Sequence, residues 1–220
     1  MADDGVTGGA TGGDGAPVRG AASRRRPEQP VLVVADAAAW RAWLDEHEDT
    51  SDGVWLTLAR KDAVDAGRGP TTLRYAAALD EALCSGWVDG QARGGDADTY
   101  GQRFTPRRAR SLWSARNVTH VARLRDEGRV RPRGEAEVAR AQADGRWDRA
   151  YAGPATMAVP DDLRAALDAQ PSLAEAFAAL GGQDRYAACH RVVTATTPAV
   201  RARRVAAVLD GLRGGAPAGP

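Results

Sequence analysis

Cysteine and histidine are scarce in this sequence, and their scarcity excludes whole classes of site. The 220 residues contain 2 Cys and 3 His. Two cysteines are too few for a disulfide framework. A metal site needs several His, Cys or carboxylate ligands brought together, but the histidines have no short mutual spacing and the cysteines lie far apart in the chain. We therefore expect no metal and no cofactor.

Long apolar segments are missing as well. No uninterrupted apolar run is long enough to cross a bilayer, and no apolar core of a secretory signal is present. We therefore expect a cytoplasmic bacterial protein that has no membrane partner.

An overall charge of one sign is also lacking, since 30 basic residues face 29 acidic ones and the formal net charge is +1. Attraction to nucleic acid must then come from local clustering. One such cluster exists, because ten arginines and only two acidic residues lie between Arg103 and Arg133. Two interpretations stay open: a nucleic-acid-binding segment, or a face of ion pairs with acidic residues nearby. We expect weak or no binding of nucleic acid.

Composition divides the chain into four segments. Residues 1–29 are rich in Gly, Ala and Asp and have almost no large apolar side chain, so we expect a disordered tail there and another over residues 214–220. Hydrophobic residues make up 43% of the sequence, which is enough for a real core in between. We expect an α+β domain that carries the site over residues 30–133, and a helical region over residues 134–213.

The spacing of apolar residues predicts the individual elements. Asp36 is the expected N-cap of a helix that runs to about Glu48. Thr71 or Thr72 is the expected N-cap of a second helix, which ends before Gly86. Strands are expected at residues 31–34, 54–60, 87–88 and 100–105, and loops at 61–70 and 94–98. Ser114 is the expected N-cap of a further helix that runs to Gly128. Other helices are expected at residues 135–144, 161–169, 171–180, 184–194 and 198–212.

These elements predict an α+β fold, with a small mixed or antiparallel sheet, packed helices and a helical C-terminal region. The strands around Trp55, Trp87 and Phe104 are expected in one sheet. The helix faces that carry Trp40 with Trp43, and Tyr75 with Leu79, are expected to pack against it.

The densest group of unusual side chains lies between Tyr75 and Asn117. Asp89 follows Trp87 and Val88 there and precedes Gly90. Asp-Gly is a common turn pair, but a carboxylate beside an indole and opposite Arg103 also suits a general acid/base or the anchor of a ligand. Both interpretations of Asp89 stay open.

Arginines and aromatic residues are mixed in the second half of this stretch. Guanidinium groups pair bidentately with oxyanions, and rings stack on planar groups. We therefore expect a pocket for an anionic small molecule. Asp89 is its candidate catalytic group. The expected ligand-binding residues are Trp87, Arg103, Phe104, Trp113 and Asn117.

Some residues nearby carry simpler expectations. Arg103 should point inward, to an ion pair or a ligand, whereas a solvated face is expected for Arg107, Arg108 and Arg110. Cys84 ends a buried helix, where a cysteine is more often a small hydrophobic residue than a nucleophile.

A succession of motifs resembles one known family. The segments WRAWL, VWL, LDEALCSGWVDGQ, RFTPRR, SLWSARN and DRYAACHRVVTATTPAVRARR resemble the YdeI/OmpD-associated proteins, also called bacteriocin-protection proteins, from about Asp36 to Arg213. The resemblance implies an α+β domain followed by a helical region, and a protective role in place of a demonstrated reaction. Ser85 stands where such proteins usually carry an aromatic residue, which is expected to open space beside Trp87.

Three functions follow as hypotheses. The first is a cytoplasmic protein of small-molecule binding and protection. The second is an enzyme that acts on an acidic or antibiotic-like metabolite with Asp89 as general acid/base. Measured turnover of such a metabolite would distinguish this hypothesis from simple binding. The third is a nucleic-acid-binding protein that uses the segment from Arg103 to Arg133, which a steep dependence of affinity on salt would distinguish.

Overall fold

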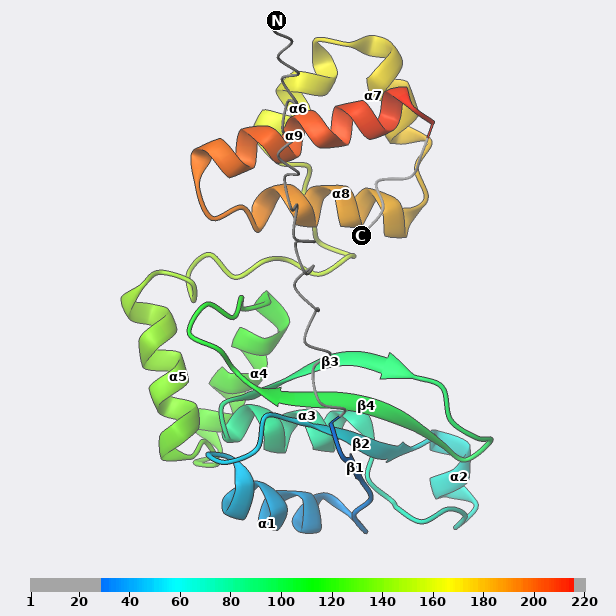
Figure 1. Ribbon diagram of the computed structural model, residues 1–220, viewed down its shortest axis with the longest axis vertical. Coiled ribbons are helices and arrows are strands. Elements are labelled where there is room, and N and C mark those ends of the chain that lie inside the picture. Colours follow the sequence, from blue (N-terminus) through cyan, green and yellow to red (C-terminus); the bar gives the residue numbers. More distant parts are fainter. Residues whose placement is uncertain (1–28, 216–220) are drawn as a thin grey trace, which may run out of the picture.

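The computed structural model describes residues 29–215 (Figure 1). The two tails expected from composition therefore fall outside the described residues, apart from positions at their inner ends. Gln29 is one of these, and its side chain bonds both the carbonyl of Asp52 and the guanidinium of Arg103.

A four-stranded sheet forms the centre of the first part of the chain, with strand order β1-β2-β4-β3. Strand β1 (Val31–Leu32) runs parallel to β2 (Val54–Ala59). Strands β3 (Trp87–Arg93) and β4 (Thr99–Pro106) form an antiparallel hairpin, and β4 also pairs with β2. The predicted mixed sheet that joins Trp55, Trp87 and Phe104 is confirmed.

Helices α1 (Ala37–His47) and α3 (Tyr75–Cys84) cover one face of this sheet (Figure 1). Side chains on alternate positions of a strand point to the same face, so β2 and β4 present Val54, Leu56, Leu58 and Phe104 to these helices. Trp40 lies at the centre of that layer with no exposed surface, and its ring centroid is 6.2 Å from that of Trp87. The predicted packing of the helix faces is confirmed.

Helix starts agree with the sequence in one case and differ in another. Asp36 caps α1 as predicted, because its Oδ1 accepts the amide of Ala39 at 2.9 Å. Helix α3 instead has Arg74 as its N-cap and no side-chain cap. The hydroxyls of Thr71 and Thr72 both donate to the carbonyl of Ala35, which ties the preceding segment to the start of α1.

The expected loop over residues 61–70 contains a helix that periodicity did not reveal. Helix α2 (Lys61–Asp65) makes little more than one turn and buries only Ala63. Five residues give too short a window for an apolar stripe, and the Lys61–Asp65 ion pair across its turn adds a modest local stabilisation.

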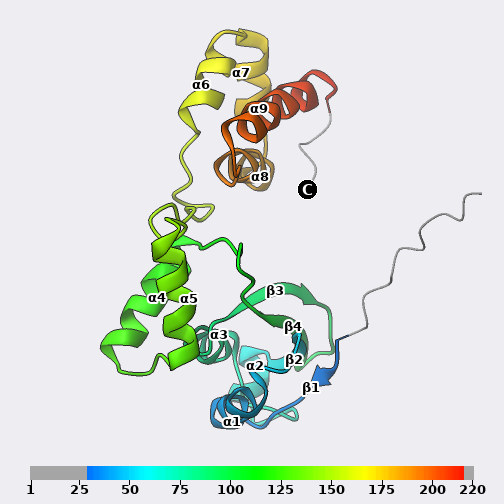
Figure 2. The same ribbon diagram turned by 60° about the vertical axis from the view of Figure 1, so that its left-hand side comes forward.

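Helices α4 (Ala115–Asp126) and α5 (Pro132–Ala143) stand at one end of the sheet, beside α3 (Figure 2). Ser114 caps α4 as predicted, since its Oγ accepts the amide of Asn117. Val138 and Ala141 of α5 belong to the same hydrophobic core as the sheet. By packing, α5 therefore belongs with the first part of the chain, whereas the sequence placed the end of that part at residue 133.

Four helices then build a second, smaller core. They are α6 (Asp161–Asp168), α7 (Pro171–Ala178), α8 (Gly182–Val193) and α9 (Pro198–Arg213). Leu163, Phe177 and Val192 are buried at its centre, and the helices form a separate group in Figure 1. The predicted helical C-terminal region is confirmed. Within residues 29–215, no helix has the length and apolar content needed to span a bilayer.

Candidate functional site

Two of the expected ligand-binding residues lie deep in the core. Trp87 and Phe104 have no exposed surface, and the indole Nε1 of Trp87 donates to the carbonyl of Glu48 at 3.3 Å. Both rings pack against Trp40. In this structure their packing holds α1 against the sheet.

The expected juxtaposition of Asp89 and Arg103 is wrong. The register pairs Asp89 with Phe104 and Arg103 with Trp55. Neighbouring residues of a strand point to opposite faces, so Asp89 lies on the helix-covered face and Arg103 on the other. Arg103 has no carboxylate partner among the described ion pairs, and its Nε donates to Oε1 of Gln29 at 2.6 Å.

Asp89 instead pairs with a tyrosine from α3. The hydroxyl of Tyr75 donates to Oδ2 of Asp89 at 2.8 Å. Burial raises the pKa of Tyr75, and the charge of Asp89 and this hydrogen bond raise it further. The phenol therefore stays protonated and serves as a donor. Burial, and then the Asp89 charge, also raise the pKa of Tyr151, which places a second phenol close to this carboxylate.

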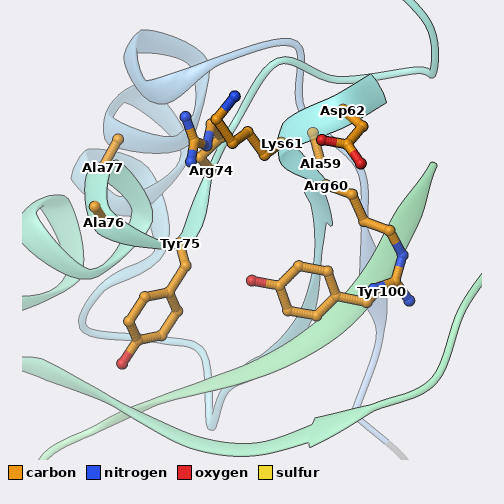
Figure 3. Close-up of a pocket in the computed structure, with 9 residues that line it drawn as sticks. All are labelled: Ala59, Arg60, Lys61, Asp62, Arg74, Tyr75, Ala76, Ala77 and Tyr100. Atoms are coloured by element: carbon orange, nitrogen blue, oxygen red, sulfur yellow. The ribbon is translucent and has the colours of Figure 1, made fainter. Parts of the chain in front are cut away.

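Tyr75 also lines the wall of a pocket, shown in Figure 3, whose volume is about 670 Å³. We call it the tyrosine pocket, and define it by its lining residues Ala59, Arg60, Lys61, Asp62, Arg74, Tyr75, Ala76, Ala77 and Tyr100. The rings of Tyr75 and Tyr100 lie on one side of it, and the side chains of Lys61 and Arg74 on another. Its size falls within the range of small-molecule sites.

Positive charge dominates the tyrosine pocket. Lys61, Arg60 and Arg74 line it against the single carboxylate of Asp62. Burial raises the pKa of Tyr100, and Arg60 and Arg74 act in the opposite direction, so both cations act on this hydroxyl. Among the described ion pairs none involves Arg74, although its neighbour Lys61 pairs with Asp65.

The uncapped start of α3 adds to the positive electrostatic potential of the tyrosine pocket. Tyr75, Ala76 and Ala77 form the first turn of the helix and line the pocket. The first amides of a helix have no partner within it, and the helix dipole favours an anion there. Together with Arg74, these groups make the tyrosine pocket suitable for a carboxylate or phosphate group.

Trp113 packs against a buried arginine, and Asn117 is a buried residue in the first turn of α4. The guanidinium of Arg107 stacks on the ring of Trp113, with its central carbon 3.5 Å from the ring centroid. Arg107 is only 4% exposed, so the expectation of a solvated face is wrong for this residue. Burial lowers its pKa to about 10, an effect that nearby Glu137 and Asp89 partly offset, and it remains charged at neutral pH.

The substitution at Ser85 does not open a space beside Trp87. Ser85 is fully buried, and its Oγ accepts hydrogen bonds from Nε and Nη2 of Arg131 at 2.9 and 2.6 Å. The same guanidinium donates to Oε2 of Glu81 at 3.1 Å. A buried polar network therefore surrounds this small side chain.

Cys84 beside this network is not a nucleophile in the folded chain. It has no exposed surface, and burial, followed by the charge of Glu81, raises its pKa to about 11. A thiol rather than a thiolate is present at neutral pH, in agreement with the interpretation as a small hydrophobic residue.

Much of the arginine cluster is engaged in ion pairs within the fold. Five of its ten members pair with carboxylates from α3, from α5 or from the segment after α1, and these are Arg123, Arg125, Arg129, Arg131 and Arg133. This arrangement supports the interpretation as an ion-paired face. Within residues 29–215, no group of three or more His, Cys, Asp or Glu side chains is placed to hold a metal ion.

Sequence reasoning did not identify Arg74 or Tyr100 as site residues. Tyr100 was assigned to a strand and Tyr75 to the core face of a helix, and both elements are correct. One signal was available for Arg74: it directly precedes the helix, where an arginine cannot cap the first amides.

Comparison with protein families gives two separate matches, one to each of the two cores. Residues 32–137 match a domain of unknown function (DUF8412), and residues 156–215 match the family described as Bacteriocin-protection, YdeI or OmpD-Associated. No curated protein and no solved structure matches the chain. The resemblance noted in the sequence is thus confirmed on the helical region, and the tyrosine pocket lies in the part with the other match.

Proposed function

We propose that this protein is a protection protein that binds an anionic small molecule. The match of its helical region to the bacteriocin-protection, YdeI or OmpD-associated family supports the protective role. The tyrosine pocket is the binding site, and binding withdraws the ligand from the cytoplasm in the manner of self-resistance proteins. The observation that carries this proposal is the placement of Arg74, which forms no ion pair with any residue from 29 to 215, beside the uncapped start of α3 and two phenols.

The pocket favours a particular class of ligand. An oxyanion at the start of α3 would gain the helix amides and a forked contact with Arg74. A planar group attached to it would lie against Tyr75 and Tyr100, since aromatic rings stack on planar molecules. An aromatic or otherwise flat carboxylate or phosphate therefore fits better than a neutral or cationic compound.

Asp89 has a positioning role in this proposal. It does not line the tyrosine pocket, but it holds the hydroxyl of Tyr75 at 2.8 Å and thereby fixes the ring that does. This role differs from the general acid/base chemistry of the enzyme hypothesis, because Asp89 acts through Tyr75 and does not contact the ligand.

Titration with 4-nitrophenyl phosphate tests the site. We expect saturable binding to the full chain, measured by calorimetry, and a loss of about tenfold in affinity for Arg74→Gln, because one charged hydrogen-bonding pair is removed. Arg68→Gln is the matched control, since Arg68 is an exposed arginine that pairs with Asp98 and does not line the pocket.

Three results would contradict the assignment of the site. They are equal affinity in both variants, equal affinity for 4-nitrophenol, and no binding at millimolar concentration. Release of 4-nitrophenol by the wild-type chain, lost on substitution of Asp89, would instead favour the enzyme hypothesis.

The Tyr75–Asp89 hydrogen bond predicts coupled effects on the same titration. Asp89→Ala and Tyr75→Phe should each lower the affinity for 4-nitrophenyl phosphate about fivefold, and the double variant should show little further loss, because both changes break one contact. Asp89→Asn retains an acceptor for the phenol and should bind almost as the wild type does. A fall in melting temperature without any change of affinity in Asp89→Ala would show that the pair is only structural.

A further inference from the structure

A second cavity lies apart from the tyrosine pocket, where the first part of the chain meets the helical region. Its volume is about 550 Å³. It is lined by the segment before α4, by the segment after α5 and by the connection from α8 to α9. We call it the arginine groove, after the four arginines that line it: Arg110, Arg146, Arg149 and Arg201.

The charges in the arginine groove are unevenly compensated. Arg201 is held by Asp162 through two hydrogen bonds, and Arg146 by Asp144, which is the only carboxylate in the lining. Arg149 donates only to the backbone carbonyl of Asp144 among the described contacts. No described ion pair involves Arg149 or Arg110, and both are exposed residues of the groove lining.

Apolar surface and free donors accompany these charges. Leu112 is 43% exposed, one of the few large hydrophobic residues that the described chain leaves open to solvent, and it lines the groove beside Trp113. Among the described residues, the buried indole Nε1 of Trp113 and Nη2 of Arg146 have no hydrogen-bond partner within the chain.

We propose that the arginine groove binds a second anionic ligand, a small amphipathic acid with one or two charged groups and an apolar body. Arg110 and Arg149 bind its acid group, and the apolar body covers Leu112 and Trp113. Small-molecule sites often lie between structural units. Such a ligand contacts the segment before α4 and the α8–α9 connection at once, and so it joins the sheet-bearing part to the helical region.

Titration with 8-anilinonaphthalene-1-sulfonate, an aromatic sulfonate whose fluorescence rises in apolar surroundings, tests this site in the full chain. Because the tyrosine pocket also suits an aromatic anion, the titration is made in the Arg74→Gln background, where we expect one saturable site per chain. The double substitution Arg110→Gln with Arg149→Gln should lower the affinity at least about tenfold, because two charge-assisted contacts are lost. Leu112→Ser should also weaken binding, whereas Arg110→Lys with Arg149→Lys should restore most of it.

Two control variants separate this groove from other positive surfaces. Arg108→Gln removes an exposed arginine next to the groove and should leave the affinity of this site unchanged. Restoring Arg74 should add at most a second, separate site in the tyrosine pocket and should also leave the affinity of the groove unchanged. The proposals for the two sites are therefore tested independently of each other. Unchanged affinity in the double Gln variant, no binding by the wild type, or equal loss in either control would overturn the proposal. Arg110 and Arg149 are exposed, and melting temperatures close to that of the wild type verify that these variants fold.

Discussion

Replacing Arg131 by Met is expected to lower the free energy of unfolding by about 3 kcal/mol, the usual cost of breaking a buried ion pair from one side. The Arg131 side chain is 12% exposed and that of Glu81 only 9%. Arg131 also supplies both hydrogen bonds to the buried Ser85 hydroxyl. Its removal leaves Ser85 without a donor and Glu81 with Arg129 alone, and both groups remain away from water.

Urea unfolding of the full chain measures this loss. The control is Arg123→Met, because Arg123 also pairs with two carboxylates but its side chain is 44% exposed. Exposed pairs contribute little, so the control should lose less than about 1 kcal/mol. Similar losses in both variants would show that burial of the Arg131 network has no energetic importance.

Gly134→Ala is expected to destabilise the chain by about 2 kcal/mol, although alanine is the better helix former. Inside an exposed helix this change gains about 0.5–1 kcal/mol. Here the new Cβ would lie 2.3 Å from the carbonyl oxygen of Cys84 and 3.0 Å from its carbonyl carbon. These are backbone atoms at the end of α3, so α5 would have to move away, at the cost typical of overpacking.

Gly182→Ala provides the matched control for this experiment. Gly182 is the first residue of α8, and a Cβ there would meet no atom within 4 Å. Thermal unfolding should show a melting temperature for Gly182→Ala equal to or above that of the wild type, and a clear decrease for Gly134→Ala. A stabilised Gly134→Ala variant would mean that α5 does not pack closely on α3.

Both predictions concern the joint between α3 and α5, which the sequence did not reveal. Composition placed a boundary between residues 133 and 134, within what became the first turn of α5. The helix itself was predicted, from Glu135 onward, because its apolar positions recur at helical spacing. Its docking on α3 depends on the contact of Gly134 with a carbonyl distant in sequence, and periodicity contains no information about that contact.

The candidate site shows a similar division. The sequence correctly identified the hairpin of β3 and β4, and it drew attention to Asp89. It placed Asp89 opposite Arg103, but the register of the hairpin pairs Asp89 with Phe104. Side chains alternate between faces, so a difference of one residue transfers a partner to the other side of the sheet. The partner of Asp89 is therefore the hydroxyl of Tyr75 and not an arginine.

The sequence by itself determined the local elements: the strands with alternating apolar residues, the helices begun by Asp36 and Ser114, and the α+β order of the chain. These features arise from the spacing of neighbouring residues and from side chains that bond their own backbone, so a short window contains the cause. The tertiary structure alone decided which arginines are buried, paired or free. Arg107, expected in solvent, stacks on Trp113 in the interior, whereas Arg74 remains beside an uncapped helix in a pocket. Burial and pairing depend on groups that come together only when distant segments pack.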